Sequence, residues 1–321
     1  MPCRPAQWRV RLVLLAASAA LAHAQLPAIY GEIAGAVWVV RELPPVVEAW
    51  RGIGLIDVHD YGHSGPGAAG QPATHCVTGR LGRFTVNLVQ ADPADSVFGD
   101  FLKRHGNGVF AILHAAPDRA AVESEIARLG ALGVGVLRKL NACGSQLTFF
   151  DTEPQGKYVL GLVLNPQAEA AMGPVLVTHL GLVIRQAAPV SAYWQRLDFP
   201  AMGLADAGPR EDSRYHGRPL WLSFGVGWHR YSQPTLEWIV PPRDPPNCYA
   251  DFLKAHGEGV QHLGMPVDDL ETAIARYAKL GYAPAQSGAW GNVGKPGSGR
   301  YAYMDTEALG GFNVELIHAV R

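Results

Sequence analysis

The sequence predicts an α+β fold built from repeated βαβββ units. Residues 251–318 contain a short strand with His262, a helix that begins at Asp268, and several strands, the last of which carries Glu315. The same pattern occurs earlier in the chain. The repeat is clearest in two motifs, since Asp-Phe-Leu-Lys-Arg-His-Gly-Asn-Gly-Val (100–109) matches Asp-Phe-Leu-Lys-Ala-His-Gly-Glu-Gly-Val (251–260), and Phe-Asp-Thr-Glu (150–153) matches Met-Asp-Thr-Glu (304–307).

The last unit has a well-marked helix between strands that alternate in side-chain direction. Asp268 can cap the helix while Glu271 reaches back to the first turn, and a buried stripe follows at helical spacing. This stripe consists of Leu270, Ile274 and Tyr277. Strand alternation predicts two inward-facing sets, Val260, His262 and Gly264 in the first strand and Asn313, Glu315 and Ile317 in the last. An imidazole and a carboxylate therefore both point inward from the sheet.

These motifs resemble the vicinal-oxygen-chelate superfamily, which includes glyoxalases, methylmalonyl-CoA epimerases, extradiol dioxygenases and bleomycin resistance proteins. The stretch FLKAHGEGVQHLGMPVDDLETAIARYAKLG, with TLEWIVPP before it, most resembles the epimerase-like branch. The resemblance covers nearly all of the mature chain. It implies four βαβββ modules that pair into two glyoxalase-like, cup-shaped barrels.

The N-terminus is typical of a secretory signal peptide. Arg4, Arg9 and Arg11 precede the apolar run 12–22, and Ala-His-Ala (22–24) has the small-x-small form of a cleavage site. The alternative is a membrane anchor, for which this run is short. Removing residues 1–24 takes away three of 27 basic side chains and none of the 28 acidic ones, so the mature net charge is −4. We therefore expect a periplasmic or secreted protein that binds no nucleic acid and, once cleaved, no membrane.

The length and cysteine content indicate two ordinary domains. About 297 mature residues can form two sizeable cores, in a monomer or a homodimer. Cys76, Cys143 and Cys248 remain after cleavage, and their spacing does not fit a zinc site. One disulfide at most is possible, and an oxidising compartment would permit it. The sequence leaves open whether it forms.

Module one is predicted at about residues 33–90. We expect a strand at 33–40, a short helix at 42–50 and strands at 55–58 and 83–89. The Gly-, Pro- and His-rich stretch 60–72 is predicted to be a loop. His59 and His63 lie near it and invite a metal interpretation, but without a carboxylate at ligand spacing we expect them to be solvated.

Module two is predicted at about residues 108–164, with a helix at 118–132. Its buried stripe should contain Val122, Ile126 and Leu129, and its solvent-exposed side Glu123, Glu125 and Arg128. Residues 165–174 then form the expected boundary between a domain at 26–165 and a domain at 174–321. Module three should begin with a strand at 175–184, on which Val175, Val177, His179 and Val183 share a face. A helix at 190–197, a final strand at 235–240 and the Pro-rich link 241–247 complete it.

Four residues take the equivalent inward positions of modules three and four: His179, Glu237, His262 and Glu315. Two imidazoles and two carboxylates on the inner face of a sheet would be costly without a compensating cation. We therefore predict one divalent metal ion (Zn, Co, Ni, Mn or Fe) held by these four residues. Any one of them alone would more often be an ordinary core or edge residue.

The N-terminal half lacks this set. The equivalent positions are Gly35 and Asn87 in module one and Ala111 and Gly161 in module two, which predicts a degenerate, metal-free domain at 26–165. Pairing modules three and four assembles all four ligands in one cup. Pairing one with four and two with three would split them, so the first arrangement is favoured.

The resemblance implies a metal that holds two oxygens of a small carbonyl substrate while an enolate-like intermediate forms. Glu237 and Glu315 are then both ligands and candidate catalytic bases, in an isomerase, epimerase or lyase reaction. The non-ligand glutamate used by the epimerases has no clear counterpart, although Glu211 and Asp212 lie in the corresponding module. The signal peptide argues against a CoA thioester. No basic cluster for its phosphates is clear either, since Arg218, Arg230, Arg243, Lys295 and Arg300 are scattered.

Two other functions remain open. An extradiol-type Fe(II) dioxygenase would use His179, His262 and Glu315, and would not need Glu237. Its acid or base could be His216, His229, Tyr301 or Tyr303. A small-molecule binding protein would instead line its cup with tryptophans. The candidates are Trp194, Trp221, Trp228, Trp238 and Trp290, of which Trp238 points away from Glu237 toward the core.

Overall fold

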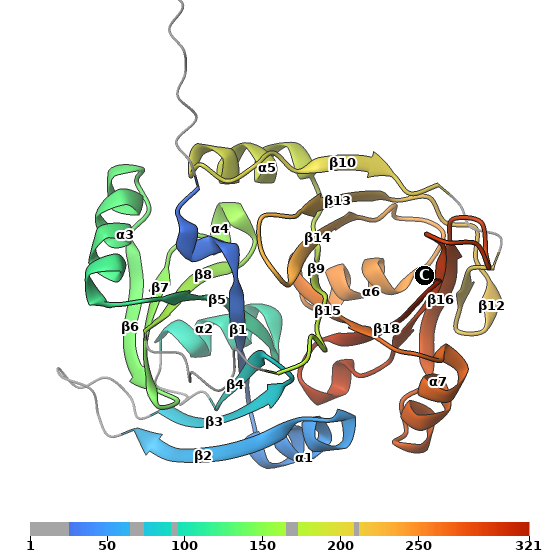
Figure 1. Cartoon of the computed structure of the whole chain (residues 1–321), viewed down its shortest axis with the longest axis horizontal. Coiled ribbons are helices and arrows are strands. Elements are labelled where there is room, and N and C mark those ends of the chain that lie inside the picture. The colour runs from blue at the N-terminus through green and yellow to red at the C-terminus, as the bar shows by residue number, and fades with distance from the viewer. Residues whose placement is uncertain (1–25, 65–73, 91–95, 165–172, 209–211, 321) are drawn as a thin grey trace, which may run out of the picture.

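Two curled sheets lie side by side in the computed structural model, one from each half of the chain (Figure 1). The structure describes residues 26–64, 74–90, 96–164, 173–208 and 212–320. The predicted signal peptide and most of the predicted boundary at 165–174 lie outside these residues. No helix among them is long and apolar enough to cross a membrane.

The N-terminal half forms an eight-stranded sheet in the order β2-β3-β4-β1-β5-β8-β7-β6. Its strands are β1 Ile33–Val40, β2 Ile56–Ser64, β3 Thr74–Leu81, β4 Phe84–Gln90, β5 Gly108–Ala116, β6 Val136–Ala142, β7 Ser145–Phe150 and β8 Val159–Leu164. Its helices are η1 Ala28–Gly31, α1 Leu43–Ile53, α2 Ser96–His105, α3 Arg119–Ala131 and α4 Glu153–Gly156.

The C-terminal half forms a ten-stranded sheet in the order β10-β13-β14-β9-β15-β18-β17-β16-β11-β12. Its strands are β9 His179–Val183, β10 Gly203–Asp206, β11 Arg214–Tyr215, β12 Arg218–Pro219, β13 Gly225–His229, β14 Thr235–Val240, β15 Gly259–Pro266, β16 Pro284–Trp290, β17 Gly299–Met304 and β18 Asn313–Ala319. Its helices are α5 Ala187–Arg196, α6 Cys248–Ala255, α7 Leu270–Lys279 and η3 Glu307–Leu309.

Each sheet contains two βαβββ modules, so the predicted α+β fold with modules three and four in one sheet is confirmed. In every module the first and last strands are parallel neighbours at the sheet centre. The register is the same in all four. The strand pairs are Gly35 with Thr85, Ala111 with Val159, His179 with Thr235, and His262 with Asn313. The predicted equivalence of Gly35, Ala111, His179 and His262 is therefore correct.

One apolar core joins the two halves. It contains the convex faces of both sheets and the helices that cover them. Phe312 from module four stacks on Trp50 of α1, with ring centroids 4.8 Å apart. In the same way Trp194 of α5 stacks on Tyr158 at 4.6 Å, and its Nε1 atom donates to the carbonyl of Gly156. Burial of these large rings fixes the two cups relative to each other.

An equivalent helix fills the inner face of each sheet. Helix α2 places Phe98 and Phe101 in an apolar cluster inside the N-terminal cup. Helix α6 places Tyr249 and Phe252 in the C-terminal cup, and Figure 1 shows α6 within the curve of that sheet. The repeated Asp-Phe-Leu-Lys motif is thus the end of the helix that fills each cup.

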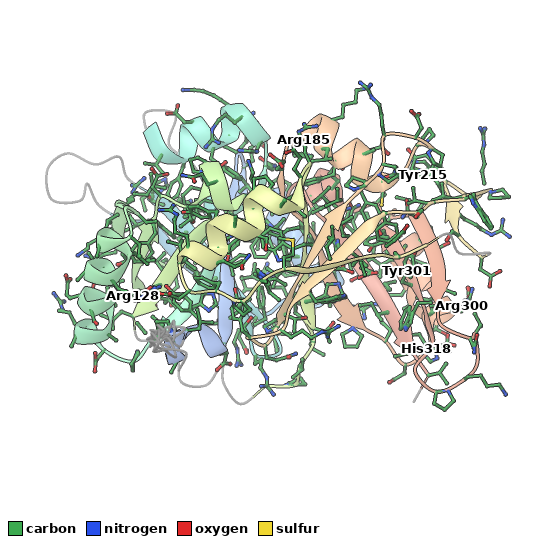
Figure 2. All side chains as sticks on the ribbon, turned by 90° about the horizontal axis from the view of Figure 1, so that it is seen from above. Arg128, Arg185, Tyr215, Arg300, Tyr301 and His318 are labelled. Carbon is green, nitrogen blue, oxygen red and sulfur yellow. A yellow bond between two sulfur atoms is a disulfide. The ribbon has the colours of Figure 1, made fainter. Side chains whose placement is uncertain are left out.

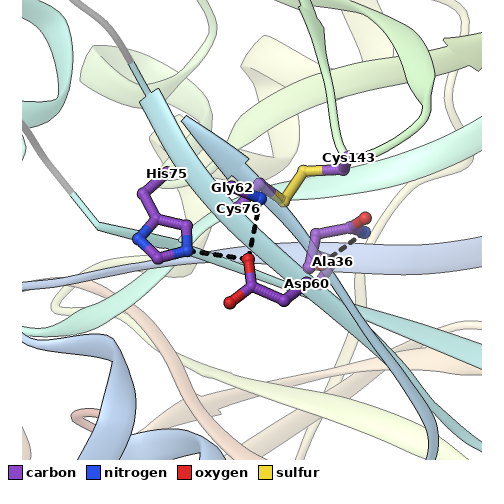
Figure 3. The surroundings of a disulfide bond; sticks show 7 residues. Ala36, Asp60, Gly62, His75, Cys76 and Cys143 are labelled. Carbon is purple, nitrogen blue, oxygen red and sulfur yellow. Dashed lines mark hydrogen bonds and ion pairs between the residues drawn. A yellow bond between two sulfur atoms is a disulfide. The ribbon is translucent and has the colours of Figure 1, made fainter. Parts of the chain in front are cut away.

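A disulfide between Cys76 and Cys143 ties β3 to the turn between β6 and β7, across the N-terminal cup. Figure 3 shows this bond beside Asp60, whose carboxylate lies 2.8 Å from His75 Nε2 and accepts from the backbone of Gly62. Cys248 is buried and free. The sequence left open whether a disulfide forms. The structure contains one, between modules one and two.

Several local predictions were wrong. Helix α7 is capped by Asp269, whose side chain accepts from Thr272 N, rather than by Asp268, and Glu271 instead pairs with Arg300. Glu125 is 3% exposed rather than solvated, because it accepts a hydrogen bond from Tyr30 and pairs with Arg128.

Strand boundaries also differed from the prediction. Residues 60–64 continue β2 rather than starting a loop, and the sequence pattern predicts no separate bounds for β3 or for the strands from β10 to β13. The strand predicted from residue 175 begins only at His179, so Val177 packs in the shared core rather than beside His179. A bulge in β15 between Val260 and His262 likewise turns Val260 toward that core.

Candidate metal centre

The four predicted ligand residues come from the four central strands of the C-terminal sheet. His179 lies on β9, Glu237 on β14, His262 on β15 and Glu315 on β18. Because β9 and β15 run antiparallel and each pairs with a parallel partner, the four side chains meet on the concave face. One donor atom from each lies within 4.8 Å of every other.

Two glycines make room for the imidazole rings. Gly181 faces His262 across the central strand pair, and Gly264 faces His179. A Cβ atom on either glycine would fall within the facing imidazole ring. Strand alternation alone does not predict this arrangement, but the repeated tripeptide His-Leu-Gly (179–181 and 262–264) is its signal in the sequence.

The donor spacing fits a single bound cation. The Nε2 atoms of His179 and His262 are 3.1 Å apart, and Glu237 Oε2 lies 3.2 Å from His262 Nε2 and 3.5 Å from His179 Nε2. Glu315 Oε2 lies 2.9 Å from His179 Nε2 and 3.6 Å from His262 Nε2. Two ligands about 2.1 Å from one ion are roughly 3.0 Å apart at a right angle and roughly 3.4 Å apart in a tetrahedron. The cluster could therefore hold a divalent metal ion.

The donors are also incompletely satisfied without a cation. Glu315 Oε2 is buried and makes no hydrogen bond of acceptable geometry, although His179 Nε2 is close. Burial lowers the pKa of His179, but its contact with Glu315 and the charge of Glu237 outweigh burial and raise this pKa overall. Burial raises the pKa of Glu315, whereas the contacts with His179, the charge of His262 and a hydrogen bond from Tyr303 together lower it. Glu315 is therefore ionised and available as a ligand.

A relay of amides fixes the proton on His262. Asn313 Nδ2 donates to the carbonyl of Met304, so Asn313 Oδ1 is left to accept from Gln261 Nε2 at 2.7 Å. Gln261 Oε1 then faces His262 Nδ1 at 2.7 Å. Since Gln261 Oε1 can only accept, Nδ1 carries the proton and Nε2 keeps its lone pair for the centre. The bulge in β15 makes this contact between sequence neighbours possible.

The centre opens into a cavity of about 580 Å³. Aromatic side chains form much of its wall, and polar groups lie around the donors. Trp228 packs edge-on against His179 with ring centroids 5.3 Å apart, and Tyr303 against His262 at 5.0 Å. Burial raises the pKa of Tyr303 well above its usual value, so its phenol stays protonated. The cavity is large enough for a small aromatic or carbonyl compound.

Of the other residues that the sequence indicated, some line the cavity and the rest lie in the core or at the surface. Trp228, Trp290, Tyr301 and Tyr303 line it. His229 points to the core, where its Nδ1 accepts from Trp238, and Trp194 is also buried there. His216 lies in the β11–β12 turn against Tyr215, and Trp221 is 68% exposed. Asp212 is exposed, and Glu211 lies outside the described residues.

The N-terminal cup has apolar side chains where the second cup has glycine. Val37 and Leu113 occupy the positions of Gly181 and Gly264, and both are buried in the cup. Asn87, at a position equivalent to the glutamates, donates to the carbonyl of Ala36. Within the described residues, the four-residue centre is the only cluster of three or more His, Cys, Asp or Glu side chains arranged to hold a metal ion.

Comparisons with known proteins agree with this arrangement. Residues 178–303 match the family described as the Glyoxalase/Bleomycin resistance protein/Dioxygenase superfamily. No curated protein sequence matches the chain. A solved mutant of 4-hydroxymandelate synthase from Streptomyces coelicolor is similar at a TM-score of 0.65 and 16% identity, over 91% of this chain and 94% of that one.

Two further solved structures are similar. One is a xylose isomerase-like TIM barrel/4-hydroxyphenylpyruvate dioxygenase fusion protein, with a TM-score of 0.53 and 15% identity over 90% of this chain and 49% of that one. The other is the Mn(II)-bound glyoxalase from Novosphingobium aromaticivorans, with a TM-score of 0.48 and 16% identity over 91% and 83%. At these identities the likeness concerns the fold. The family match over the C-terminal half and the two-sheet fold support the superfamily that the sequence motifs indicated.

Proposed function

We propose that the protein is an exported, divalent-metal-dependent enzyme of the vicinal-oxygen-chelate type, which carries out an isomerase, epimerase or lyase reaction on a small carbonyl substrate. The observation that carries this proposal is the position of Glu237, whose Oε2 atom lies within 3.5 Å of both imidazole Nε2 atoms. The resemblance to the epimerases and glyoxalases implies a set of four protein donors, of which Glu237 is the fourth. Export is supported by the signal-like N-terminus and by the Cys76–Cys143 disulfide, since such bonds persist in oxidising compartments.

His179, Glu237, His262 and Glu315 would hold the metal ion. When bound, the ion polarises a substrate carbonyl and acidifies the adjacent C–H bond. We assign proton transfer to Glu237, because its side chain is 12% exposed whereas that of Glu315 is 8% exposed. Aromatic side chains line the cavity beside the centre, and the amide relay keeps the His262 lone pair directed at the centre.

An Fe(II)-dependent dioxygenase is the second candidate, and the fold favours it. The chain shares its architecture with 4-hydroxymandelate synthase and with a protein that contains a 4-hydroxyphenylpyruvate dioxygenase. In this case His179, His262 and Glu315 form the facial set of ligands, and Glu237 is dispensable for metal binding. A cavity that only sequesters a ligand is the third candidate, and it needs none of the four donors.

Replacing Glu237 with alanine distinguishes these functions. The melting temperatures of wild type and Glu237→Ala should be measured with chelator and with added Zn²⁺, Mn²⁺ or Fe²⁺, together with metal content and oxygen uptake on catechols. In the isomerase or lyase function, Glu237→Ala loses metal-dependent stabilisation and turnover together. In the dioxygenase function, iron binding and oxygen uptake largely persist. Glu271→Ala, an exposed substitution on α7, is the matched control.

A wild-type melting temperature that is indifferent to both chelator and added metal would contradict both enzymes. Glu237→Ala would then change only the free energy of unfolding, by about 1–3 kcal/mol for a buried group that loses its partner. The binding protein would remain.

A further inference from the structure

Arg230 presents a positive charge to the cavity of the metal centre. It follows β13, where Trp228 pairs with Glu237 across to β14, so Val226, Trp228 and Arg230 face the cavity while His229 turns to the core. Among the described residues that line the cavity, Arg230 is the only lysine or arginine. Its place in the fold is therefore within the wall of the candidate site.

The guanidinium of Arg230 stacks on an aromatic ring and forms no salt bridge with a described acidic residue. Its Cζ atom lies 4.7 Å from the centroid of the Trp228 ring, and that ring in turn packs edge-on against His179. Stacking orients the guanidinium plane and leaves the N–H groups at its edge available. These edge donors match the two oxygens of a carboxylate.

The N-terminal half supports this part of the wall. Ile33 N donates to the carbonyl oxygen of Gln233 at 3.1 Å, and Gln233 N donates to the carbonyl oxygen of Gly31 at 3.3 Å. Gln233 itself lines the cavity, three residues beyond Arg230. The loop that carries Arg230 is thus fixed by backbone bonds from the other cup, which gives the degenerate half a role in shaping the site.

Much of the cavity wall is aromatic. Phe224, Trp290 and Tyr301 line the cavity together with Trp228. Flat apolar surfaces of this kind accept a planar ring. Among the described residues that line the cavity, Arg230 is the only arginine or lysine with which an anionic group on the ligand can pair.

We propose that the substrate is an aromatic compound with a carboxylate group, which Arg230 binds while vicinal oxygens on the same molecule face the four-residue centre. This inference rests on the proposed function, since it concerns the same cavity. It narrows the substrate class from small carbonyl or oxygen-chelating compounds in general to aromatic acids. Arg230 would then be a residue that determines specificity.

The test compares an acid with its neutral amide. The Zn²⁺-loaded protein, which does not catalyse redox turnover, is titrated calorimetrically with 3,4-dihydroxybenzoate and with 3,4-dihydroxybenzamide. The pair 3,4-dihydroxyphenylacetate and 3,4-dihydroxyphenylacetamide tests a carboxylate that lies one methylene group farther from the ring. Wild type should bind at least one acid about tenfold more tightly than its amide. Arg230→Gln should abolish this preference by weakening acid binding alone, and Arg230→Lys should keep part of it.

Arg300→Gln is the matched control. Arg300 precedes Tyr301 on β17, but it bonds to Glu271 on α7 and does not line the cavity. Figure 2 labels Arg300 and Tyr301 in the C-terminal half. Equal affinity for acid and amide in wild type, no binding of any probe, or a preference that survives in Arg230→Gln would each overturn the inference. If the protein takes up no metal, the proposed function fails, and the same comparison on metal-free protein still decides for or against Arg230.

Discussion

His105 and His256 each hydrogen-bond to the other's backbone. Nδ1 of His105 lies 2.6 Å from the carbonyl oxygen of His256, and Nδ1 of His256 lies 2.5 Å from the carbonyl oxygen of His105. On the other side of each ring, His105 Nε2 faces Glu153 and His256 Nε2 faces Glu307, both at 2.7 Å. The strongest repeat in the sequence therefore forms a symmetric clamp between the two halves of the molecule, away from the metal centre.

The His256 side of the clamp depends on a protonated imidazole. A carbonyl oxygen and a carboxylate can only accept, so the His256 ring donates from both nitrogens only when it is positively charged, and its raised pKa favours that form. Other charged groups nearby are Arg104, which also bonds to Glu153, and the pair formed by Lys157 and Glu258. Raising the pH removes the second proton from the His256 imidazole and hence one donor.

The first prediction concerns stability at alkaline pH. Burial lowers the pKa of His256, but the bonds to Glu307 and to the His105 carbonyl outweigh burial and raise it. The stability that protonated His256 contributes is therefore complete below the ordinary histidine pKa near 6.5. This stability is lost as pH rises through the higher pKa of the folded state. In urea unfolding between pH 6 and 9, wild type should lose stability with rising pH, whereas His256→Gln should start lower and lose less. His63→Gln, at an exposed position, should follow wild type; parallel profiles for wild type and His256→Gln would contradict the clamp.

The second prediction concerns acid. Burial raises the pKa of Glu153, but the hydrogen bonds from His105 and Arg104 outweigh it and lower this pKa to about 2. The contribution of Glu153 is thus complete above its ordinary value of 4.5 and is lost as pH falls from there toward 2. Glu153→Gln should reduce stability at pH 7 and flatten the decline between pH 5 and 2. The control is Glu123→Gln, an exposed residue of α3. A decline as steep in Glu153→Gln as in wild type would refute this assignment.

The third prediction concerns the glycines opposite the histidines. Gly264→Ala places a methyl group against the ring of His179 and should displace that ring from the centre. We expect metal affinity to fall at least tenfold in a calorimetric titration with Zn²⁺, because ligand geometry is lost. In Gly130→Ala, on α3, the new methyl group meets no neighbour, so it should leave metal affinity unchanged and raise stability by about 0.5–1 kcal/mol. Unchanged affinity in Gly264→Ala would count against the four-residue centre.

The fourth prediction concerns the amide relay. Gln261→Leu removes the acceptor for His262 Nδ1, so the ring can hold its proton on Nε2, where the metal should bind. Affinity for Zn²⁺ should fall about 10–100-fold, as is usual when a partner behind a ligand histidine is lost. Gln261→Glu keeps an acceptor at that atom and should recover a large share of the affinity. If the leucine variant binds Zn²⁺ as tightly as wild type, the relay does not orient His262.

The sequence alone determined the repeated unit and the chemistry of the candidate site. Hydrophobic periodicity and the paired motifs predicted βαβββ modules, and strand alternation placed His179, Glu237, His262 and Glu315 on inward faces. These are local properties, because the direction of a side chain from a strand depends only on its position in that strand. The same local argument failed at Val260, where a bulge interrupts the alternation.

Only the tertiary structure decided which residues meet. The spacing between donors, the bond between Cys76 and Cys143, and the approach of Arg230 to the cavity all depend on how the strands pair across the sheet. Helix periodicity predicts that Glu125 faces solvent, because periodicity cannot reveal a buried partner such as Tyr30, far away in the chain. The His105–His256 clamp shows the same limit most clearly. Its motif was visible twice in the sequence, but its role arises from contacts between halves that no local pattern encodes.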